Sequence, residues 1–178
     1  MFMLSNDMSS IWIGDLKDTP LGVIWVASSN NGLVAVNLWG ERESFVLQVH
    51  KLTGADPLYA PEQLTAVMRQ LTEYFDGQRQ RFELDIDWSV MTPFQQEALQ
   101  IVFEIEYGRT RTYGDIAQQL GKPKAVRAVG RANATNPIPI IIPCHRVLGA
   151  DGRLHGYSAP GGVETKAWLL RLEGSWLL

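Results

Sequence analysis

The sequence contains one cysteine, Cys144, and only three histidines among its 178 residues. A single thiol cannot form an internal disulfide, and it cannot supply a zinc site of the usual cysteine-rich kind. The chain also has no apolar run long enough to span a membrane, and residues 1–7 have no cationic patch of the kind that begins a secretory signal. We therefore expect a globular cytoplasmic protein with no metal, no cofactor and no membrane contact.

Acidic residues outnumber basic ones overall, but the excess is confined to the first half of the chain. Residues 1–90 have twelve acidic and six basic side chains, whereas residues 91–178 have seven acidic and ten basic ones. Eight of those ten cations lie between residues 109 and 153, where only Asp115 and Asp151 oppose them. Such a local basic surface either suits a polyanionic partner or is simply solvated.

The hydrophobic pattern divides the chain into two predicted domains, 1–90 and 91–178. Three β-branched and aromatic runs of the first domain predict strands, at residues 11–13, 22–27 and 33–39. A turn at residues 30–32 joins the last two runs as a hairpin. Apolar residues at helical spacing predict a helix over 61–77, and alternation over 82–86 predicts another strand. The first domain therefore has the pattern of a small antiparallel sheet that acts as a scaffold.

The second domain is predicted to be mainly helical and to start at a capping box. Thr92 is a suitable N-cap, Pro93 suits the first helical position, and Gln95 suits the third. A helix follows whose apolar residues recur at helical spacing, and Gly108 is expected to end it.

Two short helices are predicted next, over residues 113–120 and 124–134, on either side of a turn that contains Gly121. This is the outline of a helix-turn-helix, and equally of an αα-hairpin that has no nucleic-acid role. The second helix shows small residues and two arginines, namely Ala125, Ala128, Gly130 and Ala132 with Arg127 and Arg131. Small side chains let a helix lie close to a groove wall while a long arginine reaches in, so the composition favours DNA binding.

Cys144 stands directly beside His145. A free cysteine is commonly a small buried side chain, so Cys144 is either inert in a core or a nucleophile. A proline-punctuated run, 136–143, precedes it, and a glycine-rich loop, 149–162, follows it. The adjacent base and these irregular flanks favour the nucleophile.

The run from Asn136 to Val147 resembles the signature of the O6-alkylguanine-DNA alkyltransferases, also called methylated-DNA-protein-cysteine methyltransferases. The similarity extends from about Thr92 to Gly174, and it includes Tyr113, residues 125–130, residues 156–158, residues 166–170 and Glu173. The resemblance implies an α+β fold in which a small ribonuclease-H-like antiparallel sheet domain precedes a mainly helical domain with a helix-turn-helix.

The same resemblance implies DNA repair by irreversible transfer of an alkyl group from O6-alkylguanine to Cys144, so that each molecule acts once. Attack requires a thiolate, and an unperturbed thiol has a pKa of about 8.5, so a base must help to form the thiolate. By resemblance His145 is that base, acting through a water, and Glu173 orients its imidazole. Asn136 would tie down the turn before the cysteine, and Tyr113 would contact the target phosphate and give a proton to the departing guanine.

The resemblance also implies two sets of binding residues. Those for the flipped base are Tyr113, Pro139, Val147, Tyr157, Ser158 and Lys166. Those for the minor groove of double-stranded DNA are Arg127, which fills the stack in place of the flipped base, and Ala125, Ala128, Gly130 and Arg131. The protein is expected to act as a monomer. The loop 158–165 is longer than is common in the family, which leaves the preferred size of the alkyl group open.

Three alternative functions remain. Alkyltransferase-like proteins bind lesions without repairing them, but they carry tryptophan where Cys144 stands. A papain-style cysteine hydrolase draws its cysteine and histidine from distant elements, whereas Cys144 and His145 are consecutive. A plain DNA-binding regulator has no need of a thiol.

Overall fold

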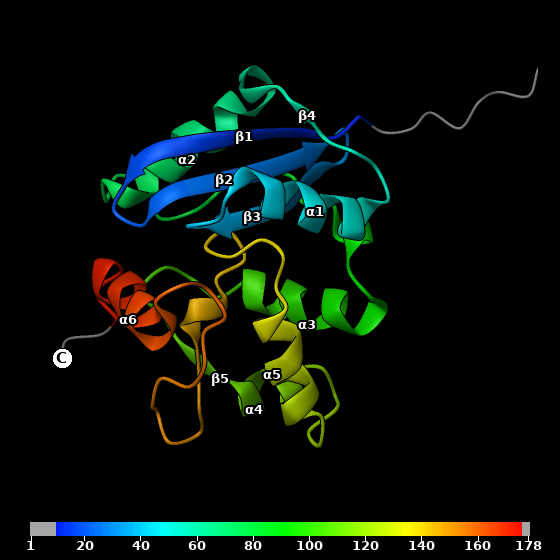
Figure 1. The fold of residues 1–178 in the computed structure, drawn as a ribbon. Coiled ribbons are helices and arrows are strands. Elements are labelled where there is room, and N and C mark those ends of the chain that lie inside the picture. The colour runs from blue at the N-terminus through cyan, green and yellow to red at the C-terminus, as the bar shows by residue number, and fades with distance from the viewer. Residues whose placement is uncertain (1–9, 176–178) are drawn as a thin grey trace, which may run out of the picture. The chain divides into compact units, whose positions relative to one another are not determined.

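The computed structural model describes residues 10–175, which form two compact units (Figure 1). The first unit contains the described residues up to Met68 together with Leu84–Val90, and the second contains Arg69–Glu83 together with the described residues from Met91 onward. The domain boundary at residue 90 stays a prediction, and Arg69–Glu83 clusters with the second unit. No helix within residues 10–175 is long and apolar enough to cross a membrane.

A four-stranded sheet forms the centre of the first unit, in the order β3-β2-β1-β4. Its strands are β1 (Trp12–Thr19), β2 (Gly22–Ser29), β3 (Gly32–Leu38) and β4 (Leu58–Tyr59). The first three strands pair antiparallel, as predicted, and the β2–β3 hairpin turns between Ser29 and Gly32. The short β4 pairs in parallel with β1, a pairing that no sequence pattern indicated.

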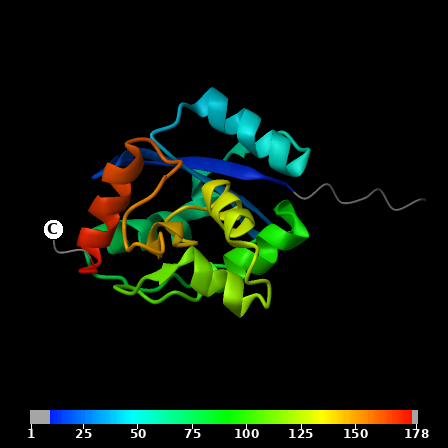
Figure 2. The same cartoon turned by 90° about the horizontal axis from the view of Figure 1, so that it is seen from below.

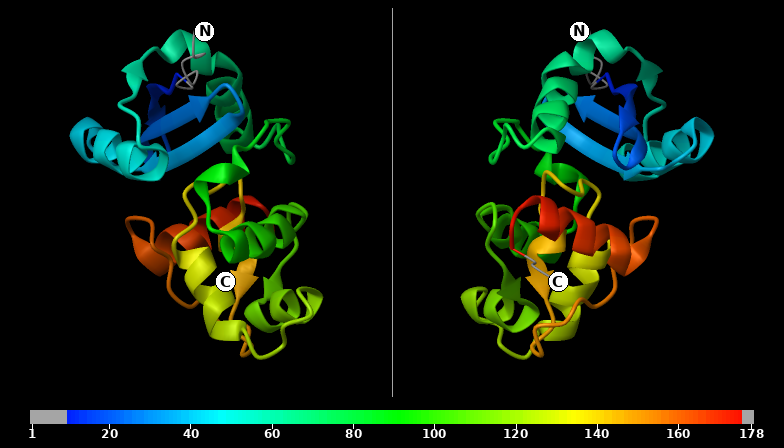
Figure 3. Two further views of the ribbon diagram at one scale, coloured as in Figure 1. Left: turned by 90° about the vertical axis from the view of Figure 1, so that its right-hand side faces the viewer. Right: turned by 90° about the vertical axis from the view of Figure 1, so that its left-hand side faces the viewer.

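Helical segments lie on both sides of this sheet (Figure 3). The helix α1 (Arg42–Thr53) packs Phe45 and Val49 into a core cluster with Trp25 and other strand residues. It was not among the predicted elements, because it buries few of its residues and its apolar periodicity is therefore weak. The 3-10 turn η1 (Pro61–Leu64) crosses β1 at Gly14, where a Cβ would lie 3.0 Å from the Pro61 Cα. Gly14 therefore permits the close approach.

The chain enters the second unit within α2 (Thr65–Phe75) and returns to the first unit at Leu84. The last segment of the first unit ends with the 3-10 turn η2 (Trp88–Val90). The strand predicted over 82–86 is wrong, because only Ile86 forms an isolated bridge with Leu33. The change of unit explains this difference. Phe82 packs beside Tyr74 in the second unit, whereas Ile86 pairs in the first, so the segment cannot follow one strand.

The second unit is mainly helical (Figure 2). Its elements are α3 (Pro93–Phe103), β5 (Arg111–Thr112), α4 (Tyr113–Gln119), α5 (Val126–Ala134), η3 (Cys144–Arg146), β6 (Val147–Leu148) and α6 (Gly162–Leu172). The helices α4 and α5 form the predicted helix pair and pack on each other and on α3. The predicted end of α3 at Gly108 is wrong, since the helix ends at Phe103 and the Ile105 carbonyl accepts a hydrogen bond from Arg146.

The capping box predicted at Thr92 is also wrong. The Thr92 side chain makes no cap hydrogen bond, and the Gln95 amide donates to the backbone carbonyl and hydroxyl of Thr135 at the end of α5. The packing of α3 on α5 offers Gln95 these partners, which a local pattern cannot show. A capping box does occur at α4, where Thr112 and Asp115 bond each other's backbone.

Replacing Gly32 by alanine is expected to destabilise the first unit by about 2 kcal/mol, because its φ of 128° disfavours an L side chain and a Cβ would lie 2.5 Å from the Asp85 carbonyl oxygen. Gly54→Ala is the matched control, since Gly54 also has a positive φ but has nothing within 4 Å of the added Cβ. Its cost is expected to be about 1 kcal/mol. Denaturant unfolding followed by tryptophan fluorescence measures both. Equal losses would contradict the steric argument.

Candidate active site

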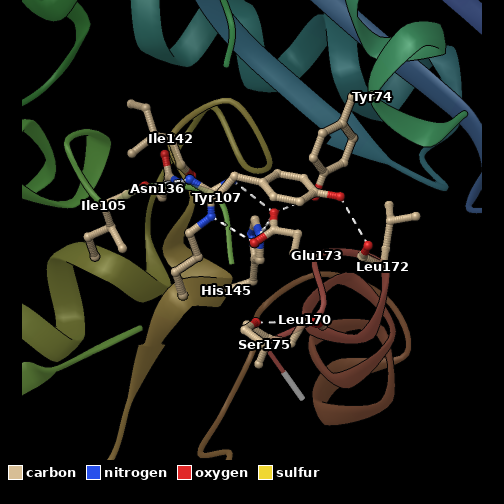
Figure 4. A network of polar contacts seen from close by, with 11 residues as sticks. Tyr74, Ile105, Tyr107, Asn136, Ile142, His145, Leu170, Leu172, Glu173 and Ser175 are labelled. Carbon is tan, nitrogen blue, oxygen red and sulfur yellow. Dashed lines mark hydrogen bonds and ion pairs between the residues drawn. The ribbon is translucent and has the colours of Figure 1, made fainter. Parts of the chain in front are cut away.

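The turn before Cys144 is held by the side chain of Asn136. Its Nδ2 donates to the Ile142 carbonyl at 2.9 Å (Figure 4). Its Oδ1 accepts from the Ile138 amide at 2.9 Å. Inside this turn Ile140 has a φ of 72°, a conformation that a β-branched residue adopts only under strain. Asn136 thus bonds both ends of a strained turn and fixes where η3 and its first residue, Cys144, begin.

Cys144 is buried at the side of a small pocket. Besides Cys144 itself, the pocket is lined by Tyr113, Asn133, Ala134, Gly156, Tyr157 and Ser158. Burial raises the pKa of the thiol, while the Asn136 side chain, the Lys166 charge and the Tyr157 hydroxyl act in the opposite direction. The thiol is therefore protonated in neutral solution, but the groups around it are those that would stabilise a thiolate.

His145 and Glu173 form a fully buried pair, with 2.7 Å between His145 Nε2 and Glu173 Oε1. Arg146 donates two hydrogen bonds to the same carboxylate, from Nε to Oε2 at 2.8 Å and from Nη2 to Oε1 at 2.9 Å. Burial alone would raise the pKa of Glu173, but His145 and Arg146 outweigh burial and lower it to about 2. The carboxylate is therefore ionised throughout the neutral range.

This charge fixes the tautomer of His145. An ionised carboxylate can only accept, so Nε2 must carry the proton and Nδ1 must carry the lone pair. Burial lowers the pKa of His145, against the pull of Glu173, and this keeps the imidazole neutral. Within residues 10–175, Nδ1 has no hydrogen-bond partner. The site therefore holds one oriented basic nitrogen, and among the described hydrogen bonds none joins it directly to the sulfur of Cys144.

Lys166 places a buried ammonium group near the thiol. Its Nζ donates to the Val147 carbonyl at 2.6 Å and to the His155 carbonyl at 3.3 Å, and it lies 5.9 Å from the centre of the Tyr113 ring. Burial lowers the pKa of Lys166 to about 8, and its interaction with Cys144 opposes this shift. Lys166 thus ties the glycine-rich loop to β6 and faces the thiol with positive charge.

The tyrosines of the pocket remain protonated. Burial raises the pKa of Tyr157 well above its usual value, and the neighbouring Cys144 raises it further. Burial also raises the pKa of Tyr113, against a contact with the Asn133 side chain. Both hydroxyls are therefore available as proton donors beside the thiol.

The structure brings most of the predicted site residues together. Around Cys144 lie Tyr113, Asn136, Tyr157, Ser158 and Lys166, with His145 and Glu173 adjoining. Two predicted base-binding residues are not among those that line the pocket, namely Pro139, which bridges to Ile142, and Val147, whose carbonyl accepts from Lys166.

The predicted DNA-binding residues lie on α5 and just before it. Arg127, Ala128 and Arg131 are exposed, while Val129 and Ala132 face the core. Ala125 and Gly130 are half-buried. The exposed face of α5 therefore consists of Val126, small side chains and two arginines. Neither arginine forms an ion pair with the rest of the described chain. The far end of the same helix, at Asn133 and Ala134, borders the cysteine pocket.

Several site residues were missed from the sequence. Asn133 donates to the Cys144 carbonyl at 3.3 Å, and Tyr74 donates to Glu173 at 2.7 Å. Neither stands next to a recognisable motif. Arg146 was visible beside His145, but only the fold shows that it grips Glu173. Within residues 10–175 no three or more His, Cys, Asp or Glu side chains are grouped to hold a metal ion.

Two family models match the chain: the ribonuclease-like domain of 6-O-methylguanine DNA methyltransferase over residues 15–88, and the DNA binding domain of the same family over residues 93–175. A methylated-DNA–protein-cysteine methyltransferase of Methanosarcina acetivorans is 42% identical over 159 residues, which cover 89% of this chain and 96% of that relative. The constitutive methylated-DNA–protein-cysteine methyltransferase of Bacillus subtilis is 40% identical over 156 residues, 88% of this chain and 92% of the relative.

Solved structures give the same picture. The crystal structure of Mycobacterium tuberculosis OGT in complex with DNA is similar to this chain with a TM-score of 0.75 and 36% identity, covering 92% of this chain and 93% of the other. The crystal structure of the Mycobacterium tuberculosis O6-methylguanine methyltransferase is similar with a TM-score of 0.75 and 36% identity, covering 94% and 95%.

Replacing Lys166 by methionine is expected to raise the pKa of the Cys144 thiol, because it removes a nearby positive charge while keeping most of the side-chain volume. The pH dependence of Cys144 alkylation by iodoacetamide should then shift to higher pH. Lys124→Met is the matched control, since Lys124 is exposed and loses the same charge. An equal shift in both variants would mean that the Lys166 charge does not act locally on the thiol.

Proposed function

Because the chain belongs to the 6-O-methylguanine DNA methyltransferase family, we propose that it repairs O6-alkylguanine in double-stranded DNA by moving the alkyl group onto Cys144. The activity is that of a methylated-DNA–protein-cysteine methyltransferase. The observation that carries the assignment to Cys144 is its position beside a pocket, next to the histidine that Glu173 orients. Each molecule acts once, because the thioether formed on Cys144 is not hydrolysed and the thiol is not regenerated.

The reaction begins with a proton transfer. The Cys144 thiol gives its proton, through one water, to the free Nδ1 of His145, and Glu173 stabilises the imidazolium that forms. In the resting site both partners are neutral, because burial raises the pKa of the thiol and lowers that of the imidazole. The thiolate is stabilised once formed by the Lys166 charge and by the Asn136 and Tyr157 side chains.

The alkyl transfer is an in-line displacement. The thiolate sulfur attacks the alkyl carbon, a C–S bond forms, and the C–O6 bond breaks with its electron pair passing to the guanine. Tyr113 donates its phenolic proton to the departing base. The proton held by His145 then passes to the Tyr113 phenolate, so that both side chains are neutral again. The position of Tyr113 in the wall of the Cys144 pocket supports that role. No cofactor takes part in this scheme.

The DNA duplex binds at the exposed face of α5. We propose that this face enters the minor groove, where the small Ala128 and Gly130 fit a narrow space and Arg131 contacts the backbone. Arg127 takes the place of the flipped guanine in the stack, which offsets an unstacking cost of a few kcal/mol. The flipped base reaches Cys144 past Ser158 and Tyr157. The protein works as a monomer in the cytoplasm, where DNA is accessible and a free thiol stays reduced.

Incubation with an excess of duplex that contains O6-methylguanine is expected to add one methyl group to the protein, on the peptide that contains Cys144. Intact-mass and peptide mass spectrometry measure this directly. Transfer should stop at one equivalent, because the acceptor is consumed. Cys144→Ala should abolish transfer and still bind duplex, since other residues contact the phosphates. Several methyl transfers per protein molecule would contradict the proposal.

Replacing Arg127 by alanine is expected to slow repair of duplex at least tenfold and to leave the reaction with free O6-benzylguanine nearly unchanged. The arginine acts on base flipping and not on the thiol. Second-order rate constants with the two substrates measure the difference. Arg81→Ala, an exposed arginine outside α5, is the charge-matched control and should change neither rate. An equal loss on both substrates for Arg127→Ala would assign Arg127 a structural role instead.

A further inference from the structure

Glu173 receives a hydrogen bond from a residue 99 positions earlier in the chain. The hydroxyl of Tyr74, on α2, donates to Glu173 Oε1 at 2.7 Å, and both side chains are buried (Figure 4). The same oxygen accepts from His145 Nε2 and from Arg146 Nη2. Tyr74 and the imidazole of His145 therefore donate to the same carboxylate oxygen.

We propose that Tyr74 is a positioning residue for the alkyl transfer described above, and that its hydroxyl weakens the pull of Glu173 on the proton of His145. The inference rests on the proposed function for its role in repair. A hydrogen bond to a carboxylate oxygen draws negative charge away from it. The imidazole consequently meets a weaker negative potential and remains neutral, which is the form that can accept the proton of Cys144.

The hydroxyl, and not the ring, is the informative part of Tyr74. The ring packs against Phe75, Phe82 and Tyr107, with centroid distances of 5.5, 5.4 and 6.2 Å. A phenylalanine would make the same contacts. The difference between the two residues is therefore the hydroxyl. A buried hydroxyl without a partner would cost free energy, and that of Tyr74 is satisfied by its hydrogen bond to Glu173.

The other charged or titratable groups around His145 come from three elements. Arg146 in η3 and Lys166 in α6 disfavour the imidazolium, and Glu173 after α6 favours it. Tyr74 on α2 is neutral, because burial and the adjacent carboxylate raise its pKa well above the usual value. Because Glu173 has a pKa of about 2, it keeps its charge in mildly acidic solution and does not mask the protonation of His145. Its titration therefore reports the balance of these groups.

The test is the titration of His145 by NMR in the full-length protein, with Tyr74→Phe compared to the parent. The chain has three histidines, and the exposed His50 and His155 serve as internal references. Loss of the hydroxyl is expected to raise the pKa of His145 by roughly half to one unit, because the carboxylate recovers its full negative charge toward the imidazole. Site-specific 3-fluorotyrosine at position 74, a stronger donor, should move that pKa downward.

The matched control is Tyr107→Phe. Tyr107 packs in the same cluster, but its hydroxyl donates to the Leu172 carbonyl and not to the Glu173 carboxylate. Its removal should leave the pKa of His145 in place. An unchanged pKa in Tyr74→Phe, or an equal change in Tyr107→Phe, would overturn the proposal.

Kinetics connect the titration to repair. The rate of Cys144 alkylation by free O6-benzylguanine should fall on the acid side as His145 gains its proton, and Tyr74→Phe should move this fall to higher pH by the same amount. If the parent protein transfers no alkyl group, the proposed function fails while the NMR titration still decides the effect of Tyr74 on His145. If transfer occurs and its pH profile is identical in Tyr74→Phe and the parent, the positioning role is wrong.

Discussion

The buried carboxylate of Glu173 is the interaction on which the rest of the second unit depends, because a charge removed from water must be matched by donors. Its four hydrogen bonds come from Tyr74, His145 and Arg146, so the end of α6, the 3-10 turn η3 and the helix α2 meet at one group. Loss of any partner would leave charge or a donor unpaired in the core. The carboxylate therefore both holds the parts of the unit together and orients His145, the base proposed for the reaction.

The same arrangement explains why the thiol can be both protected and reactive. In the resting site burial keeps Cys144 protonated and His145 neutral, so a nucleophile is not exposed to chance alkylation. The proton transfer proposed from Cys144 to His145 would create an ion pair only where Lys166 and Glu173 already supply the opposite charges. The site thus stabilises charge as it develops, with groups that are already in position before reaction.

The position of the thiol is set by the strained turn before it. Ile140 holds a left-handed conformation, and the two hydrogen bonds of Asn136 stabilise the turn against the cost of that conformation. Asn133 fastens the next segment through the Cys144 carbonyl. Since Asn133 also belongs to α5, the helix proposed to bind DNA and the residue proposed to react are connected by one side chain.

By itself, the sequence determined the elements whose signals are local: the β2–β3 hairpin, the α4–α5 pair, and the Cys144-His145 motif whose neighbours in sequence are also neighbours in the site. Only the tertiary structure decided which long-range partners these elements meet. Gln95 was predicted to cap its own helix but bonds Thr135, and residues 82–86 looked like a strand but divide between two units. Tyr74 reaches Glu173 across 99 positions, and no local pattern marks it. Periodicity and turn chemistry act over a few residues, whereas a buried charge is satisfied by whichever donors the fold brings to it.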